Sequence, residues 1–192
     1  SSLSSLILQS NGLSGAISPA IGNLTDLTSL VLDRNELSGG IPAEIGNLTK
    51  LTYLNLGSNN LSGTIPDELW QLSSLSSLWL YSNGFSGTIS PAIGNLVNLQ
   101  YLGLFSNQFS GVIPVSLGSL SQLRQIQLGS NQLSGQIPSE LGDLSLLESL
   151  FLYSNQLSGS IPVELVQLTA LKSLNLQNNL LTGLVPEGLA DL

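Results

Sequence analysis

An asparagine recurs every 24 residues along the whole chain, and a glycine follows it four positions later each time. Eight such units account for all 192 residues. A fixed period of this length is typical of a solenoid, in which each unit packs only against its neighbours and one elongated array replaces separate globular domains. The repeated asparagines are Asn11, Asn35, Asn59, Asn83, Asn107, Asn131, Asn155 and Asn179.

The third unit, residues 51–72, illustrates what one turn of the solenoid should contain. Leu54 and Leu56 lie two positions apart, so both face the interior side of a short strand, and one strand from each unit should form a parallel sheet. Asn59 ends the strand, and its amide can bond backbone groups that a buried turn would leave unpaired. Gly63 permits a tight path, and Pro66 stops a strand and precedes a short outer 3₁₀ turn. Narrow strands on one side and broader turns on the other should make the strand side concave.

These residues, written L-x-x-L-x-L-x-x-N-x-L-S-G-x-I-P-x-x-L-G-x-L, resemble the plant-specific class of leucine-rich repeats. That class occurs in plant receptor-kinase ectodomains and polygalacturonase-inhibiting proteins, and the resemblance covers all eight units. It implies an α/β solenoid, a leucine-rich-repeat horseshoe with a parallel β-sheet on the concave face and short 3₁₀ turns on the convex face. It also implies extracellular or cell-surface recognition of peptides, small hormones or proteins by the concave face and its flank.

Three departures from this family pattern stand out. The paired-cysteine caps that flank such domains are missing, so we expect residues 1–192 to be a single array from the interior of a longer protein. The Arg-x-Arg pair with which some receptors hold a peptide carboxylate has no match, because Arg124 is followed by glutamine and isoleucine. Ser18 and Ser90 replace the repeat proline, which moves one position on, and we expect a small local change in the outer turn there.

Composition excludes several function classes. Four Lys and Arg residues and a net charge of −8 disfavour nucleic-acid binding, which needs clustered basic side chains. No apolar run approaches the ~20 residues of a membrane span, and no signal-peptide pattern opens the chain. With no His and no Cys, the usual catalytic and metal-binding signatures are absent. We therefore predict no enzyme activity, no catalytic or metal site and no cofactor.

Two pairs of glutamates are the best candidates for carboxylate chemistry, because each pair occupies one slot in consecutive units. Glu44 pairs with Glu68, and Glu140 with Glu164. Such pairs could share a proton or a cation. The favoured interpretation is that they remain solvated in the first turn of an outer helical segment, where a negative charge is stabilised by the backbone dipoles.

The outward strand positions are the candidate ligand-binding surface, because the fold does not dictate their identity. They carry seven of the ten aromatic residues, and large aromatic side chains often anchor a binding partner. Alternatively, these rings simply suit a pleated surface and stack on one another. Gly129, between Phe105 and Tyr153 in one column, should leave a notch about 10 Å wide. The predicted ligand-binding residues are Tyr53, Trp79, Tyr81, Tyr101, Phe105, Arg124, Gln127, Phe151 and Tyr153.

Charged side chains near this surface should set its polar complementarity, and three other aromatic residues should serve packing alone. The charged residues are Asp33, Arg34, Arg124, Glu148 and Lys172. The packing residues are Trp70, Phe85 and Phe109, which replace glycine or leucine of the repeat. Possible N-glycosylation sites are Asn23, Asn47 and Asn60, each of which begins an Asn-Leu-Thr or Asn-Leu-Ser triplet.

Two functions from different classes remain open. The first is a non-catalytic recognition module that binds a protein, peptide or carbohydrate partner through an aromatic-rich concave face, as in receptor ectodomains. The alternative is a structural or engineered consensus scaffold without a natural ligand. Ice binding would need a regular row of threonines, whereas the slot of Thr64 and Thr88 holds Ala, Gly, Val, Gln, Ser and Leu in the other units.

Overall fold

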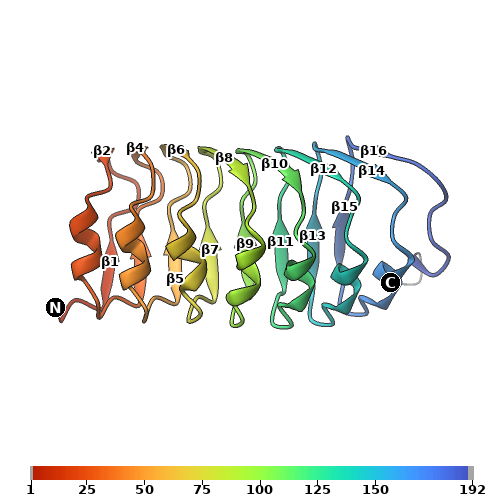
Figure 1. Cartoon of the computed structure of the whole chain (residues 1–192), viewed down its shortest axis with the longest axis horizontal. Coiled ribbons are helices and arrows are strands. Elements are labelled where there is room, and N and C mark those ends of the chain that lie inside the picture. The colour runs from red at the N-terminus through yellow and green to blue at the C-terminus, as the bar shows by residue number, and fades with distance from the viewer. Residues whose placement is uncertain (1, 190–192) are drawn as a thin grey trace.

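The chain forms an elongated coil whose turns stack along one axis, with the first and last described turns at opposite ends of the stack (Figure 1). The computed structural model describes residues 2–189. Each turn contributes a strand to a first sheet and a strand to a second sheet. In turns one to seven, a short 3₁₀ helix follows the second strand. The architecture is the leucine-rich-repeat solenoid that the 24-residue period predicts.

The first sheet has eight parallel strands in chain order. Its register is one repeat, so Leu54 lies between Leu30 and Leu78. All three leucines are fully buried, because the two-residue period of a strand turns them to the interior. The strands are β1 (Ser5–Ile7), β3 (Ser29–Val31), β5 (Tyr53–Asn55), β7 (Ser77–Trp79), β9 (Tyr101–Gly103), β11 (Gln125–Gln127), β13 (Ser149–Phe151) and β15 (Ser173–Asn175).

A second eight-stranded parallel sheet runs along the upper edge of the stack in Figure 1, and the repeat pattern did not predict it. Leu61 is buried between exposed Asn60 and Ser62, an alternation that a strand requires. Gly63, which ends β6, has a φ of +84°, where a side chain would strain the backbone. The strands are β2 (Ser14–Ala16), β4 (Glu36–Gly39), β6 (Asn60–Gly63), β8 (Gly84–Thr88), β10 (Gln108–Val112), β12 (Gln132–Gly135), β14 (Gln156–Gly159) and β16 (Leu180–Leu181).

Short 3₁₀ helices form the outer side of the coil, as predicted. Five of the seven in the described part of the chain begin after a proline that offers no side-chain cap. In the other two, Ser18 and Ser90 accept a hydrogen bond from the backbone two residues on, which confirms the expected local change. The helices are η1 (Pro19–Asn23), η2 (Ala43–Asn47), η3 (Asp67–Gln71), η4 (Pro91–Asn95), η5 (Val115–Ser119), η6 (Ser139–Asp143) and η7 (Val163–Gln167).

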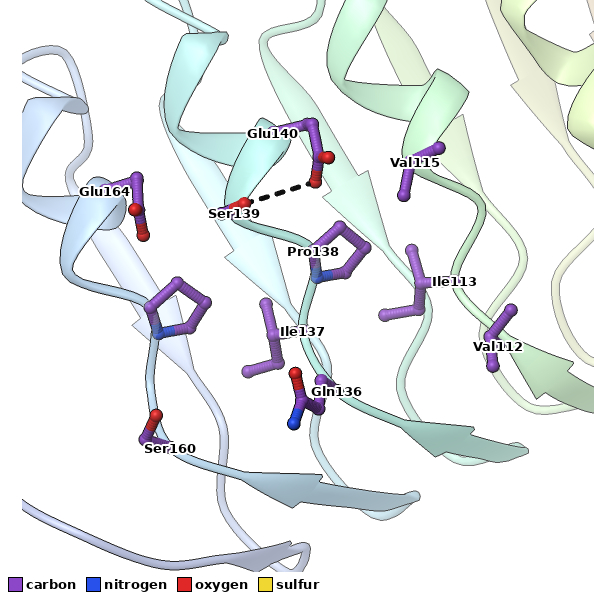
Figure 2. Close-up of a pocket in the computed structure, with 11 residues that line it drawn as sticks. Val112, Ile113, Val115, Gln136, Ile137, Pro138, Ser139, Glu140, Ser160 and Glu164 are labelled. Atoms are coloured by element: carbon purple, nitrogen blue, oxygen red, sulfur yellow. Dashed lines mark hydrogen bonds between the residues drawn. The ribbon is translucent and has the colours of Figure 1, made fainter.

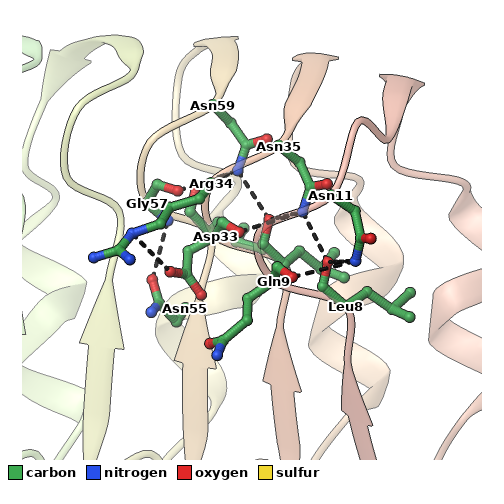
Figure 3. A network of polar contacts seen from close by, with 11 residues as sticks. Leu8, Gln9, Asn11, Asp33, Arg34, Asn35, Asn55, Gly57 and Asn59 are labelled. Atoms are coloured by element: carbon green, nitrogen blue, oxygen red, sulfur yellow. Dashed lines mark hydrogen bonds and ion pairs between the residues drawn. The ribbon is translucent and has the colours of Figure 1, made fainter.

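The repeated asparagines form a ladder of hydrogen bonds that joins neighbouring turns. Asn59 Nδ2 donates to the carbonyl of Leu56 in its own turn at 3.1 Å and to that of Leu32 in the preceding turn at 3.1 Å. Its Oδ1 accepts from the backbone N–H of Leu37 at 3.0 Å. Figure 3 shows Asn59 beside Asn35 in this ladder. Each buried amide therefore satisfies backbone groups that the turn would otherwise leave unpaired, as the sequence predicts.

Leucine and isoleucine side chains from successive turns fill a continuous apolar core. Trp70, Phe85 and Phe109 are almost completely buried in it, and the two phenylalanine rings stack at 6.5 Å. Their predicted role as packing residues is confirmed. None of the helices described between residues 2 and 189 is long and apolar enough to span a membrane.

Candidate functional site

The strand face consists of the outward side chains of the first sheet and of the positions two residues beyond each strand. Tyr53 lies on β5, Trp79 on β7 and Tyr101 on β9. Tyr81 and Phe105 lie two residues beyond β7 and β9. All five side chains are half-buried. The predicted aromatic residues of units three to five therefore share one face, and we call these five the aromatic patch.

Stacking between neighbouring turns orders the aromatic patch. The rings of Tyr81 and Phe105 are 4.9 Å apart and nearly parallel, with an interplanar angle of 4°. Trp79 and Tyr101 stack less closely, at 6.4 Å and 23°. Each such pair contributes about 0.5–1.5 kcal/mol beyond its area burial. The alternative interpretation, that the rings stack on one another across strands, thus describes part of what these side chains do.

Three glycines of the strand face are covered by aromatic rings from a neighbouring turn. A β-carbon at Gly57 would come 2.4 Å from Tyr81 Cε1, and one at Gly103 would come 2.3 Å from Trp79 Cε3. The ring in each case lies where a side chain would project. Covering a strand glycine with an aromatic ring compensates for the missing side chain.

The predicted notch at Gly129 is wrong, because Tyr153 fills it. A β-carbon at Gly129 would lie 2.5 Å from Tyr153 Cε1. Phe151 on β13 pairs in register with Gln127 on β11, and both are half-buried. The second predicted group of aromatic residues therefore lies on the same face as the aromatic patch, two turns beyond it, without the predicted pocket.

Arg124, predicted to contact a ligand, belongs to a ladder of ion pairs along one edge of the strand face. Its Nη1 lies 3.1 Å from Glu148 Oε1, and Lys172 Nζ lies 2.6 Å from Glu148 Oε2. Lys172, and secondarily Arg124, hold the pKa of Glu148 below its ordinary value. Arg124 and Glu148 also line a hollow of about 90 Å³ beside Tyr101. The two basic groups are already paired, which reduces the positive charge they can offer a ligand.

Asp33 and Arg34 lie at the other end of the strand face. Asp33 is only 6% exposed, although a carboxylate normally stays in water. Its Oδ2 lies 3.9 Å from Arg34 Nε, and the Arg34 side chain is 70% exposed. Asn55, on the neighbouring strand, is also buried, and its Oδ1 accepts a hydrogen bond from the Gly57 backbone at 3.1 Å (Figure 3).

A groove of about 420 Å³ lies on the opposite side of the coil, between the second sheet and the 3₁₀ helices (Figure 2). We call it the flank groove, and the repeat pattern did not predict it. Val112 and Val115 in its lining are about 60% exposed, and apolar residues at these positions outside the first sheet were the available signal. Its other lining residues include Ile137, Pro138, Glu140 and Glu164.

The paired glutamates remain at the surface. Glu44, Glu68, Glu140 and Glu164 all lie in the first turn of a 3₁₀ helix, as predicted. Glu140 accepts a weak hydrogen bond from Ser139 Oγ at 3.4 Å. Within residues 2–189, no three His, Cys, Asp or Glu side chains are grouped so that they could hold a metal ion. The arrangement is that of solvated acids at helix starts.

The three possible glycosylation sites are exposed. Asn23 and Asn47 end η1 and η2, and Asn60 begins β6. All three lie in the first three units of the chain, away from the second group of aromatic residues in unit seven.

A family model described as leucine rich repeat matches residues 1–61 and 27–85. A second model of the same description matches residues 98–120, 122–144, 146–168 and 170–192. A comparison with curated proteins finds no match.

Solved structures similar to the chain include two plant receptors. The crystal structure of a TDR receptor matches with a TM-score of 0.96 and 38% identity, over 98% of this chain and 33% of that one. The ectodomain of the Arabidopsis receptor kinase HAESA, solved with an extended IDA peptide hormone ligand, matches with a TM-score of 0.92 and 42% identity, over 96% and 31%. A plant ice-binding protein matches with a TM-score of 0.79 and 31% identity, over 97% and 67%. The chain spans about a third of the length of the two receptor structures.

Proposed function

Because the chain belongs to the leucine-rich repeat family and shares the fold of plant receptor ectodomains, we propose that it is a non-catalytic recognition module whose strand face binds a peptide or protein partner. The HAESA structure contains a peptide hormone, which supports a peptide as the partner class. No enzyme family matches the chain among these comparisons. Carbohydrate remains a second ligand class that the binding experiment below distinguishes.

The observation that carries this proposal is the aromatic patch. Its five large rings occupy positions whose identity the repeat leaves free, and they stay partly open to solvent. Trp79 and Tyr81 are residue types that dominate the energy of binding interfaces. A ligand that covers such rings gains apolar burial of roughly 25 cal/mol per Å².

The aromatic patch is also ordered before a ligand arrives. Tyr81 is held between the Gly57 backbone and the Phe105 ring, and Trp79 rests against Gly103 and Tyr101 of β9. Binding therefore needs little further ordering of these side chains, which otherwise costs about 0.5–1.5 kcal/mol for each one immobilised. This preorganisation favours recognition over a purely structural use of the rings.

We infer an extracellular or cell-surface location from the likeness to receptor ectodomains. In a secreted eukaryotic protein, exposed Asn23, Asn47 and Asn60 would accept glycans. Glycans on Asn23 and Asn47 would project from the 3₁₀ helices, and the one on Asn60 from the second sheet. Protein secreted from a eukaryotic host should lose mass on enzymatic deglycosylation, and no mass change would contradict this part of the proposal.

The alternative is a consensus scaffold without a ligand. The regular core of this chain and its lack of Cys, Met and His fit that interpretation. The irregular strand face does not, since a pure scaffold has no need of clustered rings. Ice binding, the function of one similar structure, is disfavoured because the row of Thr64 and Thr88 continues with valine at Val112 and glutamine at Gln136.

A selection from displayed random peptides, alongside a panel of oligosaccharides, tests the proposal. The Trp79→Ala and Phe105→Ala variants should keep the circular dichroism and melting temperature of the wild type while losing at least tenfold in affinity for selected ligands. The Val115→Ser variant, in the flank groove, is the matched control and should bind normally. Undiminished binding by both aromatic variants, or failure to select any ligand, would favour the scaffold.

A further inference from the structure

Asp33 carries a buried carboxylate oxygen that has no hydrogen-bond partner. Among the buried side-chain oxygen and nitrogen atoms of residues 2–189, Asp33 Oδ1 is the one without a hydrogen-bond partner. Its other oxygen has only a long contact, 3.9 Å, to the exposed Arg34 side chain. Burying a carboxylate without donors is costly, and buried polar atoms are nearly always paired. An unpaired oxygen here makes this position a candidate for a hydrogen-bond donor from outside the chain.

Neither Asp33 nor Arg34 is required by the repeat. The slot of Asp33 holds no other acidic residue in the eight units, and Tyr81 occupies it two turns on. Arg34 has a φ of +56°, in a slot that is serine in six other units and asparagine in the last. A left-handed backbone conformation is strained for a long side chain, so the fold does not call for arginine where the other units have serine or asparagine. The pair is therefore specific to this turn and needs an explanation other than the fold.

Two tyrosines of the aromatic patch belong to the two turns that follow Asp33. Tyr81 covers Gly57, the residue next to Asp33 in the same column of the strand face. The pKa of Tyr53 is raised, chiefly by burial and also by the negative charge of Asp33. Figure 3 shows Asp33 between Arg34 and Asn55, with the Arg34 guanidinium at the edge of the site.

We propose that Asp33, Tyr53 and Tyr81 form a subsite for a guanidinium group, such as the arginine side chain of a peptide ligand. A guanidinium is planar, weakly hydrated and rich in donors, so it suits a largely buried carboxylate better than an ammonium does. It supplies the donor that Oδ1 lacks, while Arg34, which is mostly in solvent, moves aside. This inference deepens the proposed function, on which it rests, by naming one chemical group of the partner.

The test is a titration of the chain, labelled with ¹³C at its aspartate carboxyl groups, with N-acetyl-arginine amide. N-acetyl-citrulline amide, a neutral molecule of nearly the same shape, is the control ligand. The Asp33 signal, assigned by its absence in Asp33→Asn, should shift saturably with the arginine compound, at least tenfold more than with citrulline. A response to both compounds alike, or to neither, would overturn the proposal and leave a bound water as the partner of Oδ1.

Variants separate the charge from the fold. Asp33→Asn keeps the side-chain shape and should weaken binding of the arginine compound at least tenfold, as measured by calorimetry. Glu36→Gln removes one exposed acid three residues away and should change the affinity less than twofold. Equal losses in both variants would mean that net charge alone attracts the ligand, which contradicts a site at Asp33.

The Trp79→Ala and Phe105→Ala variants distinguish failure of this inference from failure of the proposed function. If they still bind selected peptides normally while the arginine compound shifts the Asp33 signal, the aromatic patch is not the binding surface and the subsite stands. If they lose the selected peptides while the Asp33 signal never responds in the wild type, the recognition function stands and the subsite is wrong.

Discussion

The indole of Trp79 lies against Gly103 of the next turn, so closely that a β-carbon on the glycine would come 2.3 Å from Cε3 of the ring. The same relationship joins Tyr81 to Gly57 and, in a later turn, a tyrosine to Gly129. Glycine in a strand normally weakens it, because it leaves no side chain to pack. Here the aromatic residue supplies that packing from the neighbouring turn. The orientation of the rings is thus built into the backbone of the strand face.

Replacing Gly103 with alanine should therefore displace the Trp79 ring. We expect a loss of about 1–3 kcal/mol in the free energy of unfolding, the usual result of inserting a methyl group into a packed contact. Tryptophan emission should also change, measured as a difference from the wild type because Trp70 stays buried. Gly12→Ala is the control, since nothing lies within 4 Å of a β-carbon there. Equal stability and emission in the two variants would mean that the ring is not held by the glycine.

The asparagine ladder predicts a strong dependence on position along the chain. Asn59→Ala would leave the buried N–H of Leu37 without a partner and would remove one of the two side-chain hydrogen bonds to the carbonyl of Leu32, so we expect a loss of about 1–3 kcal/mol in the free energy of unfolding, measured with urea. Asn11→Ala should cost much less, because exposed Asn11 bonds only carbonyls of its own turn. Similar losses at the two positions would indicate that the ladder does not stabilise neighbouring turns.

The charge of Asp33 should affect the titration of Tyr53. Because the charge of Asp33 helps to raise the pKa of Tyr53, Asp33→Asn should lower that pKa toward its ordinary value near 10. A raised pKa stabilises the folded chain below the ordinary value, and this contribution is lost as the pH rises through the folded value. Absorbance at alkaline pH, with Tyr53→Phe to identify the transition, measures the shift. An unchanged titration in Asp33→Asn would show that the two groups do not interact.

The ion-pair ladder predicts a small effect at acid pH. The lowered pKa of Glu148 stabilises the folded chain above the ordinary glutamate value of 4.5, and this contribution is lost as the pH falls through the lowered value. The difference in stability between the wild type and Glu148→Gln should therefore shrink as the pH falls below 4.5, and also in high salt. The control is Glu44→Gln, an exposed acid with no basic partner in the described part of the chain. A gap between wild type and Glu148→Gln that does not shrink as the pH falls below 4.5 would contradict the account.

The sequence predicts the buried core of this molecule well, because the residues that recur in every unit are those that the core requires. Leucine spacing indicates the first sheet, and Asn59 indicates the ladder. The second sheet escaped prediction because its strands are short and pass through Gly63 in a left-handed conformation, which reads as a turn. The Gly129 notch was wrong because the size of a residue says nothing about the direction in which its neighbour leans.

The candidate site was only partly predictable, because the sequence does not show how side chains contact one another. Sequence position places Trp79, Tyr81 and Phe105 on one face, since strand alternation fixes the side to which they point. It does not say that Arg124 is already paired with Glu148, or that one oxygen of Asp33 lacks a donor, because both depend on side-chain contacts between turns. The flank groove likewise depends on how three turns stack.

The most direct test of the central claim, that the strand face binds the partner, is the crystal structure of the chain with a selected peptide. The peptide should lie across β5, β7 and β9, with its side chains within about 4 Å of Trp79 and Phe105. A peptide seated instead in the flank groove, against Val112 and Glu140 and away from the aromatic patch, would contradict the account.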